Sequence, residues 1–259
     1  MAKTAGNARF INKAVYRKGI PLSPTTPPSR KTAHGQQKHH NWLVHQITSE
    51  CLDSELRKYA KGTLVDIGCG IKPYASLTKG LVEKHIGVDH AGTQHAVSNV
   101  DVFGTAYDTT LPDASADTVL STAVLEHLER PQEALAEIFR ILKPGGYLIL
   151  AAPLFWHLHE EPRDFFRYTK YGLSYLIDAA GLEVVEITPM GGFIVTAVQE
   201  FCYYIDGFRN KFLRGPIRLV QTLLQHGAYR LRQFGRDRGY EYTWAYIAIA
   251  KKRPGMLAQ

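Results

Sequence analysis

Two glycines and an acidic residue at the end of a short strand form the clearest candidate binding turn in the sequence. The stretch is Thr63–Tyr74 (TLVDIGCGIKPY), where strand-forming residues run up to Asp66 and are followed by Gly68 and Gly70. Glycine is needed where the backbone turns sharply and lies against a ligand, because a Cβ would take the ligand's place. The first strand of a nucleotide-binding α/β sheet enters its phosphate or ribose turn in this way.

The residues around the glycines indicate which ligand the turn would take. A dinucleotide fingerprint requires G-x-G-x-x-G, and here Pro73 replaces the third glycine. Asp66 would repel a pyrophosphate but would attract a ligand that carries an ammonium group. S-adenosylmethionine (SAM) has an amino acid end and a sulfonium and no phosphate, so the turn favours SAM over NAD.

Five ordered stretches in the middle of the chain resemble the class I SAM-dependent methyltransferases, in particular their type 11 (UbiE-like) branch. The stretches are VDIGCG (65–70), GVDH (87–90), YDTTLP (107–112), SADTVLSTAVLEHL (115–128) and ALAEIFRILKPGGYLILAAP (134–153). The resemblance implies a SAM-dependent methyltransferase. A further pattern, HEEPRDFFRYT, resembles a subgroup with an HExPxDFxRYT acceptor loop, many of whose members are assigned to cell-surface polysaccharide pathways.

Several residues follow predicted strands and are expected to contact SAM. Asp89 ends the second strand, where a carboxylate can accept hydrogen bonds from both ribose hydroxyls, and His90 beside it is expected near the adenine or ribose. The resemblance implies that Asp108 accepts a hydrogen bond from the adenine amino group; the alternative is a simple turn residue. Ser121 ends the fourth strand, which should face the methyl group. The predicted cofactor residues are therefore Asp66, Gly68, Gly70, Asp89, His90, Asp108 and Ser121.

The segment after the fifth strand, LFWHLHEEPRDFFRYT, is dense in side chains that could do chemistry on an acceptor. Transfer to oxygen requires removal of the hydroxyl proton, and histidine is the best base at neutral pH. We predict His157 or His159 as the base, with Glu160 or Asp164 orienting it or acting instead.

The same segment offers groups that could hold the acceptor. Arg163 and Arg167 could bind a carboxylate or phosphate through forked hydrogen bonds, with Trp156 and Tyr168 beside them. The alternative is a structural clasp, in which Arg163, Asp164 and Arg167 pair with one another.

The stretch AVLEHL, Ala123–Leu128, bears on whether a metal takes part. Some methyltransferases of the resembling family hold a divalent ion through E-x-x-E-H, and here Ala123 stands in place of the first glutamate. The sequence therefore predicts no metal, with Glu126 and His127 capping and packing the turn.

The predicted elements add up to an α/β fold, a Rossmann-like seven-stranded sheet with its last strand antiparallel. Strands are expected at 63–67, 85–88, 99–103, 117–121, 147–152, 182–188 and 242–250, the last inserted between the fifth and sixth. Helices are expected at 36–59, after Pro131 with Gly145-Gly146 as the stop, and from Thr169 to Ala180. Residues 36–259 would form the methyltransferase domain, preceded by a flexible basic arm, 1–35.

A helical insertion is predicted at 190–240, where aromatic and aliphatic residues alternate with arginine. Such helices could lie on an anionic membrane, which would suit a lipid-linked glycan acceptor; a lid or dimer face is the alternative. The formal net charge of +7 and the pI of about 9.2 also fit an anionic partner.

Composition sets the remaining expectations. Cys51, Cys69 and Cys202 are odd in number and far apart, which favours a reducing compartment. With no apolar run long enough to span a bilayer and no signal peptide, we expect a cytoplasmic protein that could associate with a membrane.

The leading hypothesis is methyl transfer to an oxygen of a small-molecule or glycan-type acceptor. A nucleic-acid methyltransferase is the alternative suggested by the charge, but the fourth strand is followed by STAV rather than D/N-P-P-Y/F. A non-catalytic SAM-fold scaffold is the third possibility, which the intact glycine turn disfavours. Oligomeric state cannot be predicted.

Overall fold

The structure, a computed structural model, describes residues 39–92 and 98–254. The predicted basic arm, residues 1–35, lies outside the described residues. Within the described part of the chain, no helix is both long and apolar enough to cross a bilayer.

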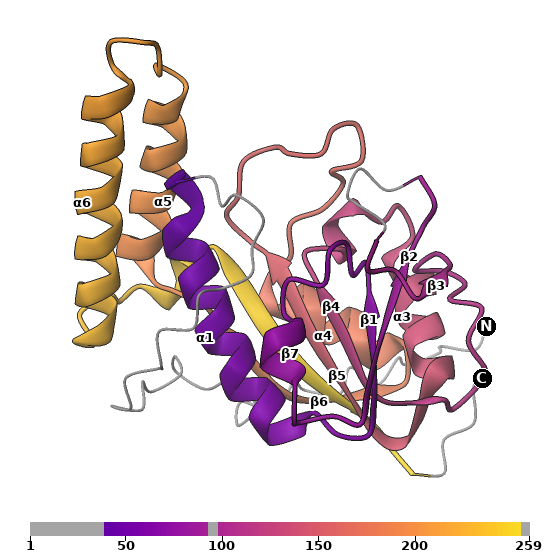
Figure 1. Ribbon diagram of the computed structural model, residues 1–259. Coiled ribbons are helices and arrows are strands. Elements are labelled where there is room, and N and C mark those ends of the chain that lie inside the picture. Colours follow the sequence, from indigo (N-terminus) through magenta and orange to yellow (C-terminus); the bar gives the residue numbers. More distant parts are fainter. Residues whose placement is uncertain (1–38, 93–97, 255–259) are drawn as a thin grey trace, which may run out of the picture.

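A seven-stranded sheet forms the centre of the molecule, in the order β3-β2-β1-β4-β5-β7-β6 (Figure 1). Pairing is parallel from β3 to β5, and β7 runs antiparallel to both β5 and β6. This confirms the predicted fold, including the place of the last strand. The strands are β1 (Thr63–Ile67), β2 (Lys84–Asp89), β3 (Val102–Phe103), β4 (Ala116–Thr122), β5 (Leu142–Pro153), β6 (Leu182–Pro189) and β7 (Ala245–Lys252).

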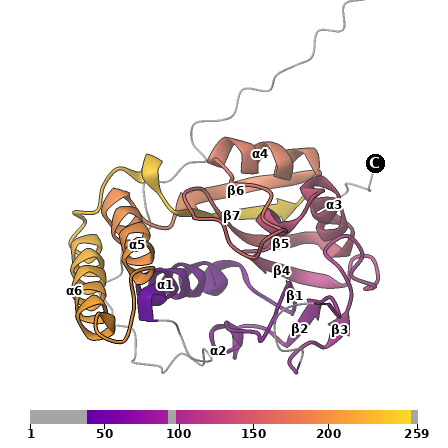
Figure 2. The same cartoon turned by 90° about the horizontal axis from the view of Figure 1, so that it is seen from above.

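Helices cover both faces of the sheet, as Figure 2 shows from above. The apolar side of α1 (Trp42–Tyr59) packs on one face, where Leu43, Ile47 and Leu56 share a core with strand residues. On the other face, α3 (Pro131–Ile141) and α4 (Lys170–Ala179) bury a second core. A short helix, α2 (Ala75–Thr78), follows β1. Both faces of the central strands are covered, which explains their nearly continuous apolar sequences.

The predicted insertion is an antiparallel helical pair, α5 (Phe193–Asp206) and α6 (Arg214–Gln233), that projects from one end of the sheet (Figure 1). It is tied to α1 by buried polar contacts, because Gln225 Oε1 accepts from Leu43 N at 3.0 Å. At its base, the buried carboxylate of Asp237 accepts hydrogen bonds from the backbone N–H groups that start α5. These come from Gly192 at 2.6 Å, Ile194 at 3.0 Å and Val195 at 3.4 Å.

The prediction that Gly145-Gly146 stops a helix is wrong. Helix α3 ends at Ile141, and the glycines lie inside β5, where the register with β4 shifts. Carbonyl oxygens at the end of α3 find a hydrogen-bond donor in a distant residue. The buried Lys252 ammonium donates to the carbonyl oxygens of Phe139 at 2.6 Å and Leu142 at 2.8 Å. A lysine at the far end of the chain therefore caps the helix, which local turn signals could not reveal.

Two strand boundaries also differ from the prediction. The third strand is reduced to Val102–Phe103, and β7 begins at Ala245 because residues Tyr240–Tyr242 form a short 3-10 helix. Strand ends are the least certain part of a sequence-based assignment, because they depend on pairing partners rather than on local pattern.

Replacing Asp237 by alanine should lower the free energy of unfolding by about 1–3 kcal/mol, because three N–H groups at the start of α5 lose their acceptor. Urea denaturation of both proteins measures the change. As a control, Asp53→Ala removes a surface pair with Arg57 on α1 and should cost under about 0.5 kcal/mol. Equal stabilities of the two variants would contradict this role of Asp237.

Candidate active site

The glycine turn after β1 has the conformation that its sequence suggested. Gly68 and Gly70 have φ values of +70° and +48°, in the left-handed region that favours glycine. A Cβ on Gly68 would lie 2.4 Å from Cγ2 of Val124, so the turn packs directly against the chain that leaves β4. The turn therefore sits at the carboxyl edge of β1 and β4, where ligands bind in open α/β sheets.

Asp89 joins this turn to the end of β2. Its Oδ2 accepts from the backbone N–H of Gly70 at 2.8 Å, and its Oδ1 accepts from that of His90 at 2.8 Å. The carboxylate is largely buried, yet each oxygen retains a lone pair that a ribose hydroxyl could use. The structure thus brings together Gly70, Asp89 and His90, three of the predicted cofactor residues.

Asp66 has a partner that the sequence did not reveal. Its Oδ2 lies 3.2 Å from Nε2 of His85 on the neighbouring strand, and the His85 Nδ1 lies 2.9 Å from the Thr78 hydroxyl. Burial raises the pKa of Asp66, while the His85 contact lowers it. Asp66 therefore contacts His85 whether or not a ligand is bound. This contact could be foreseen only from the register between β1 and β2.

The other two predicted cofactor residues differ in setting. Asp108 is exposed, and its Oδ1 accepts from the Thr110 N–H at 3.0 Å, so it caps its own turn. Ser121 is buried on β4, opposite Ile67 of β1.

The residues at this edge fit SAM better than a dinucleotide. Two buried carboxylates, Asp66 and Asp89, lie at or beside the glycine turn. The nearby Lys72 is engaged by the carboxylate of Asp101 and by the carbonyl oxygen of His85. A pyrophosphate would thus meet carboxylates and a cation that is already paired, whereas hydroxyl and ammonium groups would meet acceptors.

The segment that follows β5, residues 154–169, was predicted to bind the acceptor and is called the acceptor loop here; it contacts the turn after β4. The backbone N–H groups of Phe165 and Phe166 donate to the Glu126 carbonyl oxygen at 2.9 and 3.2 Å. The buried Tyr168 hydroxyl donates to the Leu125 carbonyl oxygen at 2.9 Å. Tyr168, predicted to bind substrate, thus anchors the loop in this structure.

Arg167 holds the acceptor loop in shape. Its guanidinium donates to both carboxylate oxygens of Asp164, at 2.6 and 2.7 Å. It also donates to the carbonyl oxygens of Trp156, Phe166 and His157, so its five N–H groups are all used. Arg167 holds the pKa of Asp164 well below its usual range. This pair is part of the clasp that the sequence offered as the alternative to acceptor binding, without its third predicted member, Arg163.

Arg163 differs from Arg167, because its side chain is exposed and lies 3.5 Å from the Glu129 carboxylate. Trp156 packs among the rings of His157, Tyr203 and Trp244, with centroids 5.2–5.4 Å apart. Tyr203 comes from α5, so the insertion contributes to this side of the site, which no local pattern in the sequence indicated.

The two loop histidines have different surroundings. The His157 ring is 4.0 Å from the Tyr203 ring, and its nitrogens make no hydrogen bond to the described residues. His159 Nδ1 lies 3.4 Å from Asp164 Oδ2, so Asp164 can orient it as expected. Burial lowers the pKa of both histidines, which favours the neutral form.

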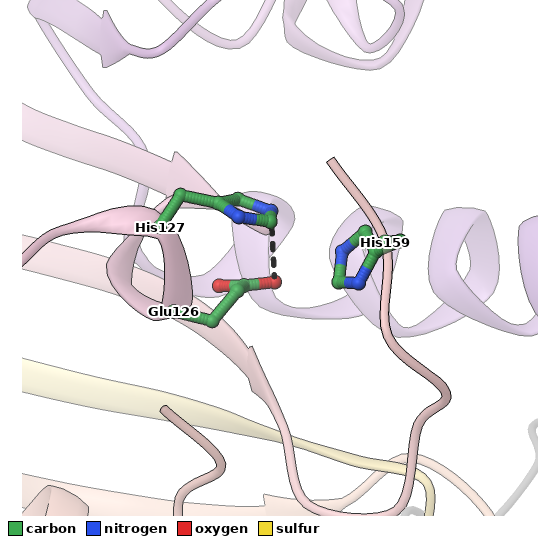
Figure 3. Close-up of side chains that lie close together, drawn as sticks. All are labelled: Glu126, His127 and His159. Atoms are coloured by element: carbon green, nitrogen blue, oxygen red, sulfur yellow. Dashed lines mark ion pairs between the residues drawn. The ribbon is translucent and has the colours of Figure 1, made fainter. Parts of the chain in front are cut away.

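Glu126 and His127, from the turn after β4, lie together with His159 of the acceptor loop (Figure 3). Glu126 Oε1 is 4.0 Å from His127 Nε2, and the exposed Glu160 places its Oε2 3.8 Å from the same nitrogen. Burial raises the pKa of Glu126 to about 8. The sequence analysis assigned Glu126 and His127 only to capping and packing the turn. It did not bring in His159, because this residue approaches them only through the folding of a distant loop.

Comparison with known proteins identifies the domain. Residues 65–150 match the family described as "Methyltransferase domain". A probable S-adenosylmethionine-dependent methyltransferase of Mycolicibacterium smegmatis is 28% identical over 167 residues, covering 60% of this chain and 64% of that protein. The mouse tRNA (carboxymethyluridine(34)-5-O)-methyltransferase ALKBH8 is 28% identical over 166 residues, covering 57% of this chain and 24% of that protein. The alignments thus span less than two thirds of either relative.

Among solved structures, the crystal structure of the 4+2 cyclase SpnF superposes with a TM-score of 0.56 at 18% identity, covering 85% of this chain and 86% of that one. At this identity the similarity shows the fold alone. The resemblance to the type 11 branch is confirmed at the level of the domain, whereas the acceptor-loop subgroup stays a prediction. Residues 65–150 therefore match a methyltransferase-domain family on a sheet of the class I methyltransferase fold, and the similarity to a SAM-dependent enzyme supports SAM as the cofactor.

Proposed function

We propose that the protein transfers a methyl group from SAM to an oxygen of a hydroxyl-bearing acceptor, small or glycan-type. The observation that carries this proposal is the contact between the two halves of the site. The turn after β4 packs Val124 on the glycine turn and, two residues later, holds the acceptor loop through the Glu126 carbonyl oxygen. Cofactor and acceptor groups therefore meet at one edge of the sheet.

Each predicted cofactor residue has a role in this proposal. Asp89 accepts hydrogen bonds from the ribose hydroxyls, Asp66 faces the ammonium group of SAM, and Asp108 and His90 lie toward the adenine ring. SAM supplies the activated methyl group, and the in-line displacement depends chiefly on positioning. Arg163 binds a negative group on the acceptor, while the Arg167–Asp164 pair keeps the loop in place.

His157 takes the acceptor proton in this proposal. Its ring nitrogens are not hydrogen-bonded within the described residues, and its lowered pKa keeps it unprotonated at neutral pH. As the acceptor oxygen attacks, a carbon–oxygen bond forms, the carbon–sulfur bond breaks, and the proton passes to His157.

We further propose that the acceptor is presented at an anionic membrane, on which the hairpin tip, residues 207–218, docks. Phe208, Phe212 and Leu213 are exposed there, with Phe212 77% exposed. Arg209, Lys211, Arg214 and Arg218 surround them, and residues 207–235 contain no Asp or Glu. Exposed aromatic rings with a basic surround suit a surface of anionic lipid.

RNA is the second candidate partner, because a tRNA methyltransferase is among the relatives and the same basic surface could contact phosphates. RNA and a lipid surface require different features of the protein. RNA bases would stack on single aromatic rings, whereas a bilayer would bury a cluster of apolar side chains. The exposed aromatic and aliphatic side chains at the tip therefore favour the membrane.

Asp89→Ala should weaken binding of S-adenosylhomocysteine by at least about 10-fold, because charged hydrogen bonds to the ribose are worth about 1.5–3 kcal/mol each. Calorimetric titration measures the affinity, with NADH as a ligand expected not to bind. The control variant Asp113→Ala removes a carboxylate that pairs with Arg140 at the surface and should bind normally. Absence of S-adenosylhomocysteine binding by the folded wild-type protein would refute the proposed function.

Removal of the base should alter the pH profile of methyl transfer. Because the neutral form of His157 is active and its pKa lies below its ordinary value of 6.5, kcat/KM should rise with pH below about 6.5 and level off by pH 7. His157→Gln should lower kcat by about 100- to 10,000-fold and abolish the rise, as measured with labelled SAM and a lipid-linked glycan fraction. The exposed His226→Gln should leave the profile intact, and a persistent rise in His157→Gln would assign the base elsewhere.

The double variant Phe208→Ser/Phe212→Ser should lose flotation with phosphatidylglycerol vesicles, which the wild type should bind more than pure phosphatidylcholine vesicles. Tyr175→Ser, which removes an aromatic ring 71% exposed on α4, is the matched control and should float normally. Tight binding of tRNA without any vesicle binding would instead favour the RNA candidate.

A further inference from the structure

The cluster of Glu126, His127 and His159 gathers three side chains of the kinds that bind metal ions. One ligand atom from each residue can be chosen so that all three lie within 4.8 Å of one another. Ligands bound to one ion at about 2.0–2.2 Å are about 3.0–3.5 Å apart. Figure 3 shows the three side chains close together, so shifts of about 1–2 Å in the ligand atoms would close the site.

Hydrogen bonds orient both histidines as ligands. His127 Nδ1 lies 2.6 Å from the Arg163 carbonyl oxygen, so Nδ1 carries the proton and Nε2 keeps its lone pair. His159 Nδ1 lies 3.3 Å from the His157 carbonyl oxygen and 3.4 Å from Asp164 Oδ2, which likewise leaves Nε2 as the acceptor nitrogen. Metal-binding histidines are held in this way, with the second ring nitrogen donating to a carbonyl or carboxylate.

Glu126 contributes a buried carboxyl group, with His127 Nε2 4.0 Å from its Oε1. Its side chain is 1% exposed, and Oε2 makes no hydrogen bond within the part of the chain that the structure describes. Arg167, the cation placed to help, uses all its donors on Asp164 and on carbonyl oxygens. A buried carboxylate is costly unless it is protonated, paired or bound to a metal, so a bound cation is one way to stabilise the ionised form of Glu126.

The donor set indicates the class of ion. Two imidazoles and one carboxylate suit Zn²⁺, Co²⁺ or Fe²⁺, whereas Mg²⁺ and Ca²⁺ prefer sites made of oxygen. Three protein ligands also leave coordination positions open, which is typical of catalytic rather than structural sites. The motif E-x-x-E-H is incomplete at Ala123, and His159 from the acceptor loop lies where it could take the place of the missing ligand.

We propose that Glu126, His127 and His159 bind one divalent transition-metal ion whose open position takes the acceptor hydroxyl. Metal binding follows from the cluster itself, while the role given to the ion rests on the proposed methyl transfer. Coordination would lower the pKa of the hydroxyl, whose proton passes to His157 as the oxygen–methyl bond forms and the methyl–sulfur bond breaks. No oxidant or reductant is required.

The test uses the full chain without an affinity tag, stripped of metal by a chelator and titrated with Co²⁺ and then Zn²⁺. The wild type should bind one ion per chain, with visible Co²⁺ absorption that Zn²⁺ displaces. Glu126→Gln, His127→Asn and His159→Asn should each weaken binding by at least about 100-fold, more than loss of an outer partner costs. His157→Asn, a histidine on the same loop but outside the ligand set, should bind the ion as the wild type does.

Two further readouts separate the possible failures. Each variant should keep the wild-type affinity for S-adenosylhomocysteine, which shows that it is folded. Absence of saturable Co²⁺ absorption in the wild type, or unchanged binding in His159→Asn, would overturn the site. Metal binding without any S-adenosylhomocysteine binding would instead leave the site standing and remove the proposed methyl transfer.

Discussion

The turn that leaves β4 is the constraint on which both halves of the site depend. Ala123 begins it in the left-handed region, with φ of +54°, and its N–H donates to the Ala151 carbonyl oxygen of β5. The next residue, Val124, occupies the space that a side chain on Gly68 would need. Glu126 then offers its carbonyl oxygen to two N–H groups of the acceptor loop. A shift of this turn would therefore disturb the glycine turn and the acceptor loop together.

The sheet and the cofactor side were predictable because their signals are local. A strand that ends in glycines, followed by a second strand that ends in Asp89, specifies both the turn and the carboxylate that meets it. The acceptor side was less predictable, because its contacts join distant segments. The sequence left open whether Arg167 and Asp164 bind the acceptor or each other, and the fold shows that they bind each other. No local pattern indicated that Lys252 caps α3 or that Tyr203 meets His157.

The same fold can serve different chemistries, as the similarity to a cyclase illustrates. In this chain the function proposed above assigns the acceptor to the loop after β5 and the helical pair before β7. The two are in contact through His157 and Tyr203, and the loop is also fixed to Trp244, whose carbonyl oxygen accepts from Leu154 N at 2.8 Å. In the proposed function, acceptor choice would therefore rest on segments that pack on one another rather than on the glycine turn.

The antiparallel place of β7 has a consequence for how such proteins diversify. The chain leaves the sheet at Pro189 and returns at Ala245, and Pro189 is paired in register with Tyr246. The two ends of the insertion are thus held side by side by the strands themselves, whatever lies between them. Closing a longer excursion between fixed ends costs little, since the entropy grows only with the logarithm of length. Helical pairs of other lengths could therefore replace this insertion between β6 and β7 while the cofactor-binding edge of the sheet stays unchanged.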